Sequence, residues 1–332
     1  MTSYTRREFS KIALAALPAA GLWSAASAPL RAAEAASPTT PATKPNSKVN
    51  GVQIGLNVPY SFGNNVMGAD EVLKNCVQLG VSSLELRTQP VELFLGVPEA
   101  LLNTRAAATG GAAVPADPAL VQANAEKLRQ WRLGASMDRV KEFRRMYESS
   151  GVQIEILKVD NMFRLTDDVL DYNFTMAKML GARAISCEIS AKEDDLVRVG
   201  RFADKHQMMV GYHGHAATIP AHWEHAFSLA KYNGANVDLG HFVAGNNVSP
   251  VEFIKKQHAR ITHVHVKDRK LHEGPNTPFG EGDTPIVEVL RLIRDNKWDI
   301  QATIEFEYRV PAGSTRMAEI ARAVKYCRDA LA

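Results

Sequence analysis

Short apolar runs rich in β-branched residues alternate with amphipathic stretches from Gly51 to the end of the chain. The apolar runs cover residues 52–57, 82–87, 152–158, 183–188, 208–213, 235–238, 261–266 and 302–307. The stretches between them have the apolar spacing of helices, over 70–79, 137–149, 167–180, 194–206, 222–232, 250–258, 285–295 and 317–331. Gly80, Gly151 and Gly181 follow three of these stretches, where a helix commonly ends. The pattern predicts eight strand–helix units.

Repeated strand–helix units indicate an α/β fold with parallel strands, and eight of them predict a closed (β/α)8 TIM barrel. We expect one barrel domain over residues 49–332. A doubly wound open sheet is the alternative, but it usually carries a G-x-G-x-x-G loop after its first strand. Residues 56–63 are Leu-Asn-Val-Pro-Tyr-Ser-Phe-Gly instead, which favours the barrel.

One connection is much longer than the others. Residues 90–134 separate the second strand from its helix and include an Ala-, Gly- and Pro-rich part followed by a helical part that contains Trp131. Because this insertion leaves the C-terminal end of a strand, we expect a lid-like segment near the mouth of the barrel. A disordered surface insertion is the alternative.

Residues 1–36 have the order of an export signal. Arg6 and Arg7 precede Phe9 and Lys11, and a weakly apolar stretch of small residues follows. This arrangement resembles the twin-arginine signal, with a small-x-small cleavage site near residue 35. Residues 37–48, rich in Pro, Ser, Thr and Lys, are expected to be a linker. The resemblance implies export of a folded protein, so a periplasmic or secreted location is expected.

The composition narrows the function classes. Hydrophobic residues make up 45% of the chain and charged residues 23%, which excludes wholesale disorder. The net charge is +3, and the first 36 residues supply most of it, so the remainder has no basic stripe for nucleic acid. Three cysteines cannot form a disulfide framework. We therefore expect no nucleic-acid partner and no stable membrane anchor.

Acidic and imidazole side chains gather at the C-terminal ends of successive predicted strands. All ten histidines lie between His206 and His272. In a barrel, alternate strand residues point into the lumen and the active site forms at the C-terminal rim, so these groups would converge. They are Glu188, His213, His215, Asp238, His263, His265, Glu305 and Glu307.

Several carboxylates in an apolar barrel mouth are costly unless a cation neutralises them. Carboxylate and imidazole donors suit one divalent ion such as Mn²⁺, Co²⁺, Mg²⁺, Fe²⁺ or Zn²⁺, and we favour Mn²⁺. Cysteine is missing from the set apart from Cys187 beside Glu188, which argues against a structural zinc–thiolate site. The chain is therefore expected to bind a metal at the barrel mouth.

Four features resemble the xylose isomerase-like TIM-barrel superfamily of sugar isomerases and epimerases. They are His213-Gly-His215, Asp238-x-x-His241, His263-Val-His265-Val-Lys267-Asp268, and Phe279-Gly-Glu-Gly-Asp283 followed by Glu305. In keto-sugar 3-epimerases of this superfamily, a Glu, an Asp, a His and a Glu on strands five to eight bind one metal, and the two Glu residues exchange the substrate proton. The resemblance assigns Asp238, His265 and Glu305 as ligands and His241 as a substrate contact.

Strand five departs from that pattern, because His213 stands where the family has a Glu. Imidazole can bind a metal, but it is neutral and shorter in reach. Glu188 on the neighbouring strand is the other candidate, and we expect one of the two not to be a ligand. An epimerase with two symmetric carboxylates would lose one of its proton carriers here.

The resemblance implies proton abstraction next to a carbonyl through a metal-stabilised enediolate. We expect Glu305 to be the base, His241 or His215 the second acid/base, and Lys267 or Lys158 a partner for oxygen. Glu85 and Trp131 are expected to contact a sugar. Since an exported enzyme would rarely meet sugar phosphates, a non-phosphorylated sugar or keto-sugar is the expected substrate.

Two other functions stay open. A 3-keto-glycoside lyase would use the same enediolate to expel the glycosidic oxygen, and the asymmetric His and Glu pair is compatible with it. A non-catalytic sugar-binding barrel is the other. Barrels of this type often pair, so a homodimer is also compatible with the sequence.

Overall fold

The computed structural model describes residues 44–102 and 117–332, and all of it belongs to one compact unit, Thr43–Ala332. The expected export signal and most of the expected linker lie outside the described residues. In the described part, no helix has the length and apolar character needed to cross a membrane.

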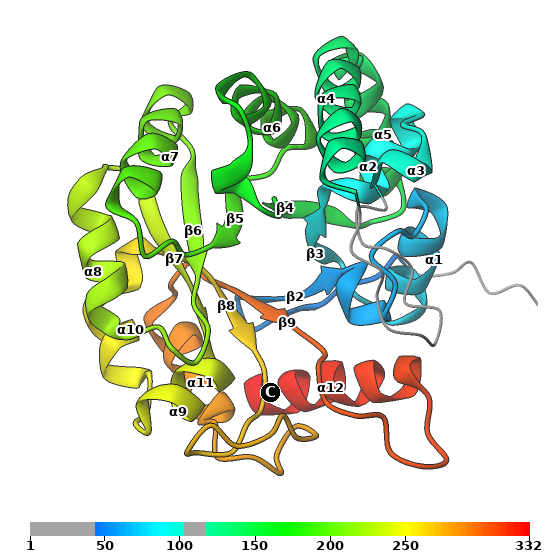
Figure 1. The fold of residues 1–332 in the computed structure, drawn as a ribbon. Helices are drawn as coiled ribbons and strands as arrows, with labels where there is room; N and C mark the ends of the chain where they lie inside the picture. Colours follow the sequence, from blue (N-terminus) through cyan, green and yellow to red (C-terminus); the bar gives the residue numbers. More distant parts are fainter. Residues whose placement is uncertain (1–43, 103–116) are drawn as a thin grey trace, which may run out of the picture. The chain divides into compact units, whose positions relative to one another are not determined.

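A closed barrel of parallel strands forms the centre of this unit (Figure 1). Each strand pairs with the next along the chain, and β2 also pairs with β9, which closes the ring. The strands are β2 Val52–Val58, β3 Ser83–Arg87, β4 Gln153–Lys158, β5 Ala184–Glu188, β6 Met209–His213, β7 Asn233–Asp238, β8 Ile261–Val266 and β9 Gln301–Ile304. The expected TIM barrel is confirmed.

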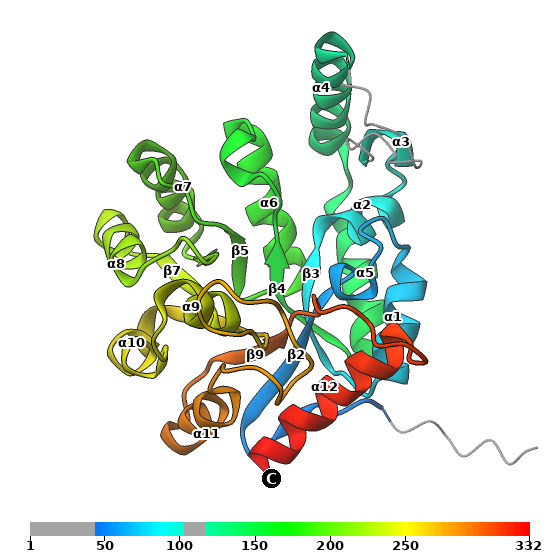
Figure 2. The same cartoon turned by 60° about the horizontal axis from the view of Figure 1, so that its bottom comes forward.

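Helices surround the barrel (Figures 1 and 2). Those that follow the strands in the expected alternation are α1 Ala69–Gln78, α5 Met137–Ser149, α6 Asp167–Leu180, α7 Glu193–His206, α8 Pro220–Leu229, α10 Val251–Gln257, α11 Ile286–Asn296 and α12 Arg316–Leu331. Gly181 ends α6 with a φ of 80°, a left-handed conformation that glycine adopts without strain. The helices contribute buried residues to the core around the strands. On α11, these include Val289 and Ile293.

Several elements had no separate prediction. The two-residue strand β1, Lys48–Val49, pairs antiparallel with the start of β2 at the N-terminal end of the barrel. The helix α9, Leu239–Asn246, begins directly after β7, and the backbone N–H of His241 in its first turn donates to the Asp238 side chain. Three short 3₁₀ turns, Tyr60–Phe62, Met162–Arg164 and His258–Arg260, complete the described elements.

The long connection after β3 contains three helices, α2 Thr88–Leu95, α3 Glu99–Leu102 and α4 Pro118–Gly134. The helix α2 follows β3 without a loop and is partly buried. The helix α4 packs against α6, where Arg129 pairs with Asp168 in the first turn of α6. Because α6 starts at the C-terminal end of β4, this insertion lies at the rim of the barrel mouth. Residues 103–116 lie outside the described part.

Candidate active site

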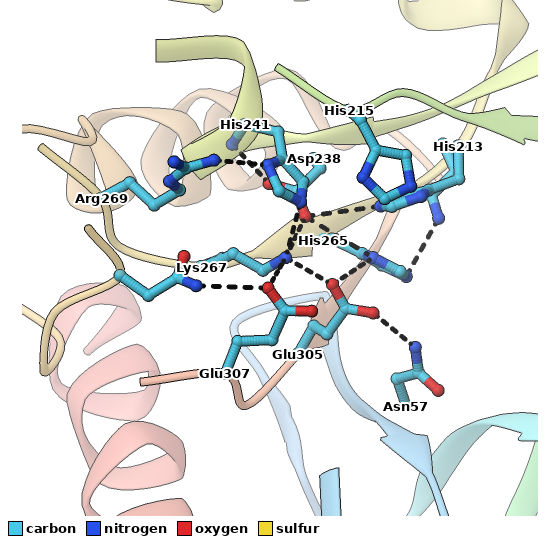
Figure 3. Close-up of polar contacts among 12 residues, drawn as sticks. Asn57, His213, His215, Asp238, His241, His265, Lys267, Arg269, Glu305 and Glu307 are labelled. Atoms are coloured by element: carbon cyan, nitrogen blue, oxygen red, sulfur yellow. Dashed lines mark hydrogen bonds and ion pairs between the residues drawn. The ribbon is translucent and has the colours of Figure 1, made fainter. Parts of the chain in front are cut away.

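The C-terminal ends of β6 to β9 bring four side chains together (Figure 3). His213, Asp238, His265 and Glu305 each offer one ligand atom, and these atoms all lie within 4.8 Å of one another. All four residues are buried. Strand register explains the convergence, since His213 pairs with Asn236, and Asp238 pairs with His265 on the next strand. We call these residues the four-residue cluster.

His213 is oriented by Glu188 from the neighbouring strand β5. Its Nδ1 atom lies 2.9 Å from Glu188 Oε2, so the ring must donate this hydrogen bond to the carboxylate. The opposite atom, Nε2, lies 3.4 Å from Asp238 Oδ2 and faces the cluster. Of the two candidates for the fourth ligand, His213 on β6 thus points into the cluster, and Glu188 on β5 lies behind it.

His265 is held in the same way by Glu85. Its Nε2 atom lies 2.5 Å from Glu85 Oε2, and its Nδ1 atom lies 3.4 Å from Glu305 Oε2. Glu85 is fully buried and also faces His263 at 3.4 Å. The structure therefore places Glu85 behind His265, on the side of the ring away from Glu305, and a contact between Glu85 and a sugar stays a prediction. Burial opposes the charged form of Glu85, but His265 and His263 outweigh this and lower its pKa.

The carboxylates of Asp238 and Glu305 each have one oxygen in a hydrogen bond and the other oxygen facing the cluster. Asp238 Oδ1 accepts the backbone N–H of His241 at 2.7 Å, as the N-cap of α9, and its Oδ2 faces the cluster. Glu305 Oε1 accepts from the side-chain amide of Asn57 at 2.9 Å, and its Oε2 faces the cluster. Each of the four side chains is thereby fixed from behind.

Lys267 places a positive charge beside this cluster (Figure 3). Its Nζ atom lies 3.0 Å from Asp238 Oδ2, 2.6 Å from Glu305 Oε2 and 2.7 Å from Glu307 Oε2. Burial opposes the charge on Lys267, but the three carboxylates outweigh it and raise its pKa. Burial likewise opposes ionisation of Glu305, while Lys267 and His265 lower its pKa, so Glu305 is a carboxylate at neutral pH.

The donor set fits a divalent cation. Two imidazole nitrogens and two carboxylate oxygens suit first-row divalent ions, and their other polar atoms are already engaged. The buried Nδ1 atom of His265 has no hydrogen-bond partner among the described residues. The position of the Lys267 ammonium shows that these oxygens accommodate a cation. His213, Asp238, His265 and Glu305 would hold such an ion.

A protein-family comparison matches residues 120–330 to the xylose isomerase-like TIM barrel. The match includes the whole four-residue cluster. The chain belongs to this family. It is also similar to a curated inosose dehydratase from Clostridium perfringens, with 25% identity over 158 residues, which is 41% of this chain and 52% of that protein. The chain thus matches about half the length of this relative.

Solved structures show the same xylose isomerase-like barrel. A xylose isomerase domain protein from Planctomyces limnophilus has a TM-score of 0.55 and 14% identity, over 86% of this chain and 98% of that one. The apo 3-keto-D-glucoside 4-epimerase from E. coli has a TM-score of 0.54 and 11% identity, over 84% of this chain and 99% of that one. At such identities the similarity is one of fold.

The remaining expected site residues lie around the cluster of this xylose isomerase-like barrel, with one exception. His241 lies between two cationic side chains. Its Nε2 atom is 3.1 Å from Lys267 Nζ, and its Nδ1 atom is 2.7 Å from Arg269 Nη1. Burial, opposed by Asp238 and reinforced by Lys267, lowers the pKa of His241 to about 4. Trp131 is the exception, because it lies half-buried on α4 beside the Arg132 that binds Glu92.

Glu188 connects two further expected residues. The buried Lys158 Nζ lies 2.7 Å from Glu188 Oε1, and the exposed His215 Nε2 lies 2.7 Å from Glu188 Oε2. The hydrogen bond to Glu188 raises the pKa of His215, so His215 is more easily protonated than a free histidine. His215 is therefore exposed at the entrance with a raised pKa, whereas the pKa of the more buried His241 is lowered.

Sequence reasoning missed three polar residues of the site. Asn57 at the end of β2 holds Glu305, and Tyr60 donates to Glu307 Oε1 at 2.5 Å. Arg269, two residues after Lys267, reaches His241. Asn57 carried the same signal as the histidines, a polar residue near the C-terminal end of a barrel strand. Tyr60 and Arg269 lie in connections, where strand alternation gives no indication of direction.

Proposed function

We propose that this protein is a metal-dependent isomerase or epimerase that abstracts a proton next to the carbonyl of a non-phosphorylated sugar or keto-sugar. The observation that carries the proposal is the convergence of His213, Asp238, His265 and Glu305, with a cationic donor, Lys267, beside them. A divalent cation held by these four side chains, Mn²⁺ by preference, would polarise a substrate carbonyl and make the neighbouring C–H more acidic.

Glu305 is the proposed base. Its carboxylate is ionised, and Asn57 fixes one oxygen so that the other faces the cluster. A base with a fixed orientation needs little reorganisation to take the proton from carbon. Lys267 lies 2.6 Å from the same oxygen and can donate to a substrate oxygen that becomes negative as the proton leaves.

A second proton carrier lies on the opposite side of the cluster. His215 is exposed at the mouth, and Glu188 favours its protonated form. An imidazolium there can return a proton to carbon on the face away from Glu305, as an epimerase requires. His241, with a pKa of about 4, is neutral and suits a hydrogen bond to a substrate hydroxyl.

Three of the cations near the cluster support a substrate without a phosphate group, whereas Arg269 is bonded to His241 and to the backbone carbonyl of Gly274 and not to a carboxylate. Lys158 is paired with Glu188, Arg87 with Asp160, and Lys267 with three carboxylates. A phosphate site normally offers cationic donors that are not already neutralised. These three side chains are committed to carboxylates, so they favour a neutral sugar.

Elimination from a keto-sugar is the second candidate. It would begin with the same proton abstraction by Glu305, but His215 would then protonate a leaving oxygen instead of carbon. Two observations favour it: the raised pKa of His215, which suits an acid, and the similarity to inosose dehydratase, whose name denotes loss of water. A 3-keto-glycoside would release its aglycone by this route.

Product analysis tests both candidates. The purified protein, loaded with Mn²⁺, is incubated in D₂O with 3-keto-glucose and with a 3-keto-glucoside. We expect deuterium to enter next to the carbonyl, and Glu305→Gln to slow this exchange by about 100-fold or more. An epimer supports the first candidate and a free aglycone the second. Exchange at the wild-type rate in Glu305→Gln, with Glu252→Gln as an exposed control, would contradict both.

A further inference from the structure

A cavity of about 540 Å³ lies between α4 and the segment from the end of β4 to α6. Figure 2 shows α4 next to α3, standing away from the barrel strands. The cavity volume falls within the range of small-molecule sites, roughly 300–1,000 Å³. It contains none of the residues of the four-residue cluster, so it is a separate space.

Two ion pairs fix α4 as one wall of this cavity. Arg132 on α4 binds both oxygens of the fully buried Glu92 on α2, at 2.7 and 3.1 Å. Arg129, one helical turn earlier, binds Asp168 on α6. Since all four residues belong to helices, the wall is built by fixed elements. Arg129 and Arg132 are thereby paired, whereas Arg164, an exposed lining residue, has no ion pair among the described residues.

The lining combines polar and aliphatic side chains and contains two unused hydrogen-bond acceptors. Its aliphatic part includes Leu128 on α4 and, from the segment between β4 and α6, Val159, Leu165 and Val169. The side-chain oxygen of Asn173, a residue only 1% exposed, and that of Gln89 have no hydrogen-bond partner among the described residues. An apolar group that carries hydroxyl donors would match both the aliphatic walls and these oxygens.

The cavity adjoins the catalytic mouth through one ion pair. Asp160 lines the cavity and binds Arg87, whose guanidinium lies 4.7 Å from the centre of the Tyr60 ring. Tyr60 in turn donates to Glu307, a partner of Lys267. Val159, also in the lining, follows Lys158 directly in the chain. The cavity and the four-residue cluster therefore lie on the two sides of the Arg87–Asp160 pair.

We propose that this cavity is a second subsite that binds the non-reacting part of a keto-glycoside, a largely apolar aglycone with hydroxyl groups. The sugar ring would lie over the cluster, and the aglycone would pass the Arg87–Asp160 pair to reach Asn173 and Gln89. That the ligand is part of a keto-glycoside rests on the proposed function. Binding of an aglycone alone to this cavity does not depend on that function.

Ala125 on α4 allows a direct test, because it lines the cavity but is exposed, so a large side chain there fills the space without disturbing the core. Ala123, two residues earlier and also exposed, does not line it and gives a matched control. The probe is 4-methylumbelliferone, a fluorescent hydroxylated bicyclic ring, titrated into the metal-free full chain. We expect binding to the wild type and to Ala123→Trp, and at least a tenfold weaker affinity in Ala125→Trp and in Asn173→Leu.

Absence of binding to the wild type, or equal affinity in Ala125→Trp, would overturn the subsite. A kinetic arm separates this from failure of the proposed function. With the Mn²⁺-loaded protein, Ala125→Trp should raise the KM for the 3-keto-glucoside of 4-methylumbelliferone at least tenfold more than the KM for 3-keto-glucose. If the wild type binds the probe but turns over neither compound, the subsite stands and the proposed reaction fails.

Discussion

Glu188 Oε2 lies 2.9 Å from Nδ1 of His213, on the side of the ring that faces away from Asp238. A carboxylate behind a metal-binding histidine fixes the tautomer and the direction of the ring. On the fifth strand of the barrel, β6, His213 thus stands where the resemblance predicts a Glu, and the Glu188 carboxylate orients its ring. This relationship separates a ligand role for His213 from a supporting role for Glu188.

Glu188→Gln should weaken divalent-metal affinity by about 10–100-fold, because His213 loses the acceptor that orients it. His213→Ala should weaken it further, since a donor atom is removed. Titration of Mn²⁺ into the metal-free variants, followed by calorimetry, measures both. Glu193→Gln, an exposed pair with His225 just after β5, is the control. A larger loss in Glu188→Gln than in His213→Ala would make Glu188 the ligand.

Glu85→Gln should destabilise the barrel. Glu85 is fully buried between His263 and His265, and loss of one member of a buried charged pair typically costs about 3–5 kcal/mol. Urea unfolding of the variant should show a correspondingly lower free energy of unfolding, whereas the exposed Glu71→Gln should not differ from the wild type. An unchanged stability with a raised KM for the sugar would support the expectation that Glu85 contacts the substrate.

His215 should titrate above the ordinary histidine range of about 6.5, because Glu188 accepts its hydrogen bond and favours the imidazolium. This raised pKa stabilises the folded state below the unfolded pKa, and the contribution is lost as pH rises through the folded pKa. NMR titration of the ring protons in the metal-free protein measures it. In Glu188→Gln the pKa should fall. A pKa that is the same in both proteins would contradict the contact.

Lys267→Met should lower the Tm of the metal-free protein by roughly 10 °C, because Asp238 and Glu305 are left buried without a charge partner, at a cost of about 3–5 kcal/mol. Saturating Mn²⁺ should restore much of this loss, since it supplies the missing positive charge. Thermal unfolding in EDTA and in Mn²⁺ measures the difference, with the exposed Lys255→Met as the control. No rescue by any of the divalent ions considered would argue against a metal at the cluster.

Replacement of Arg6 and Arg7 by lysine should block export, if residues 1–36 function as a twin-arginine signal. In a bacterial host with this export route, the wild type should be found in the periplasmic fraction, and the double variant inside the cell at full length. Replacement of Arg31 by lysine, outside the motif, should leave export unchanged. Equal export of the double variant would remove the basis for an exported enzyme.

The strand–helix alternation was sufficient to predict the barrel, because each strand carries a buried apolar run and each helix one apolar face. For α5 and α6 even the bounds agree with the structure. The position of β9 was less clear, since Glu305 and Glu307 continue the alternation beyond Ile304, where pairing in the strand ends. β1 was missed because two residues are too short to show a pattern.

The convergence of the four-residue cluster was predictable from the ends of the strands, but the supporting contacts were not. Alternation places His213, Asp238, His265 and Glu305 toward the lumen, and it does so equally for Glu85. Glu85 differs from them in its position against Nε2 of His265, on the side of the ring away from Glu305, and sequence gives no measure of that position. Trp131 lies on α4, whose packing involves the distant Asp168, and a contact between Trp131 and a sugar stays a prediction.

The ammonium of Lys267 among three carboxylates has a consequence for the order of assembly. A barrel whose acidic side chains are partly compensated by one of its own lysines can complete its folding before it encounters any ion. An ion of the kind proposed would then be captured late, and it would be open to exchange and to the supply of whichever compartment the finished protein occupies. Glu307 would keep Lys267 anchored through that exchange.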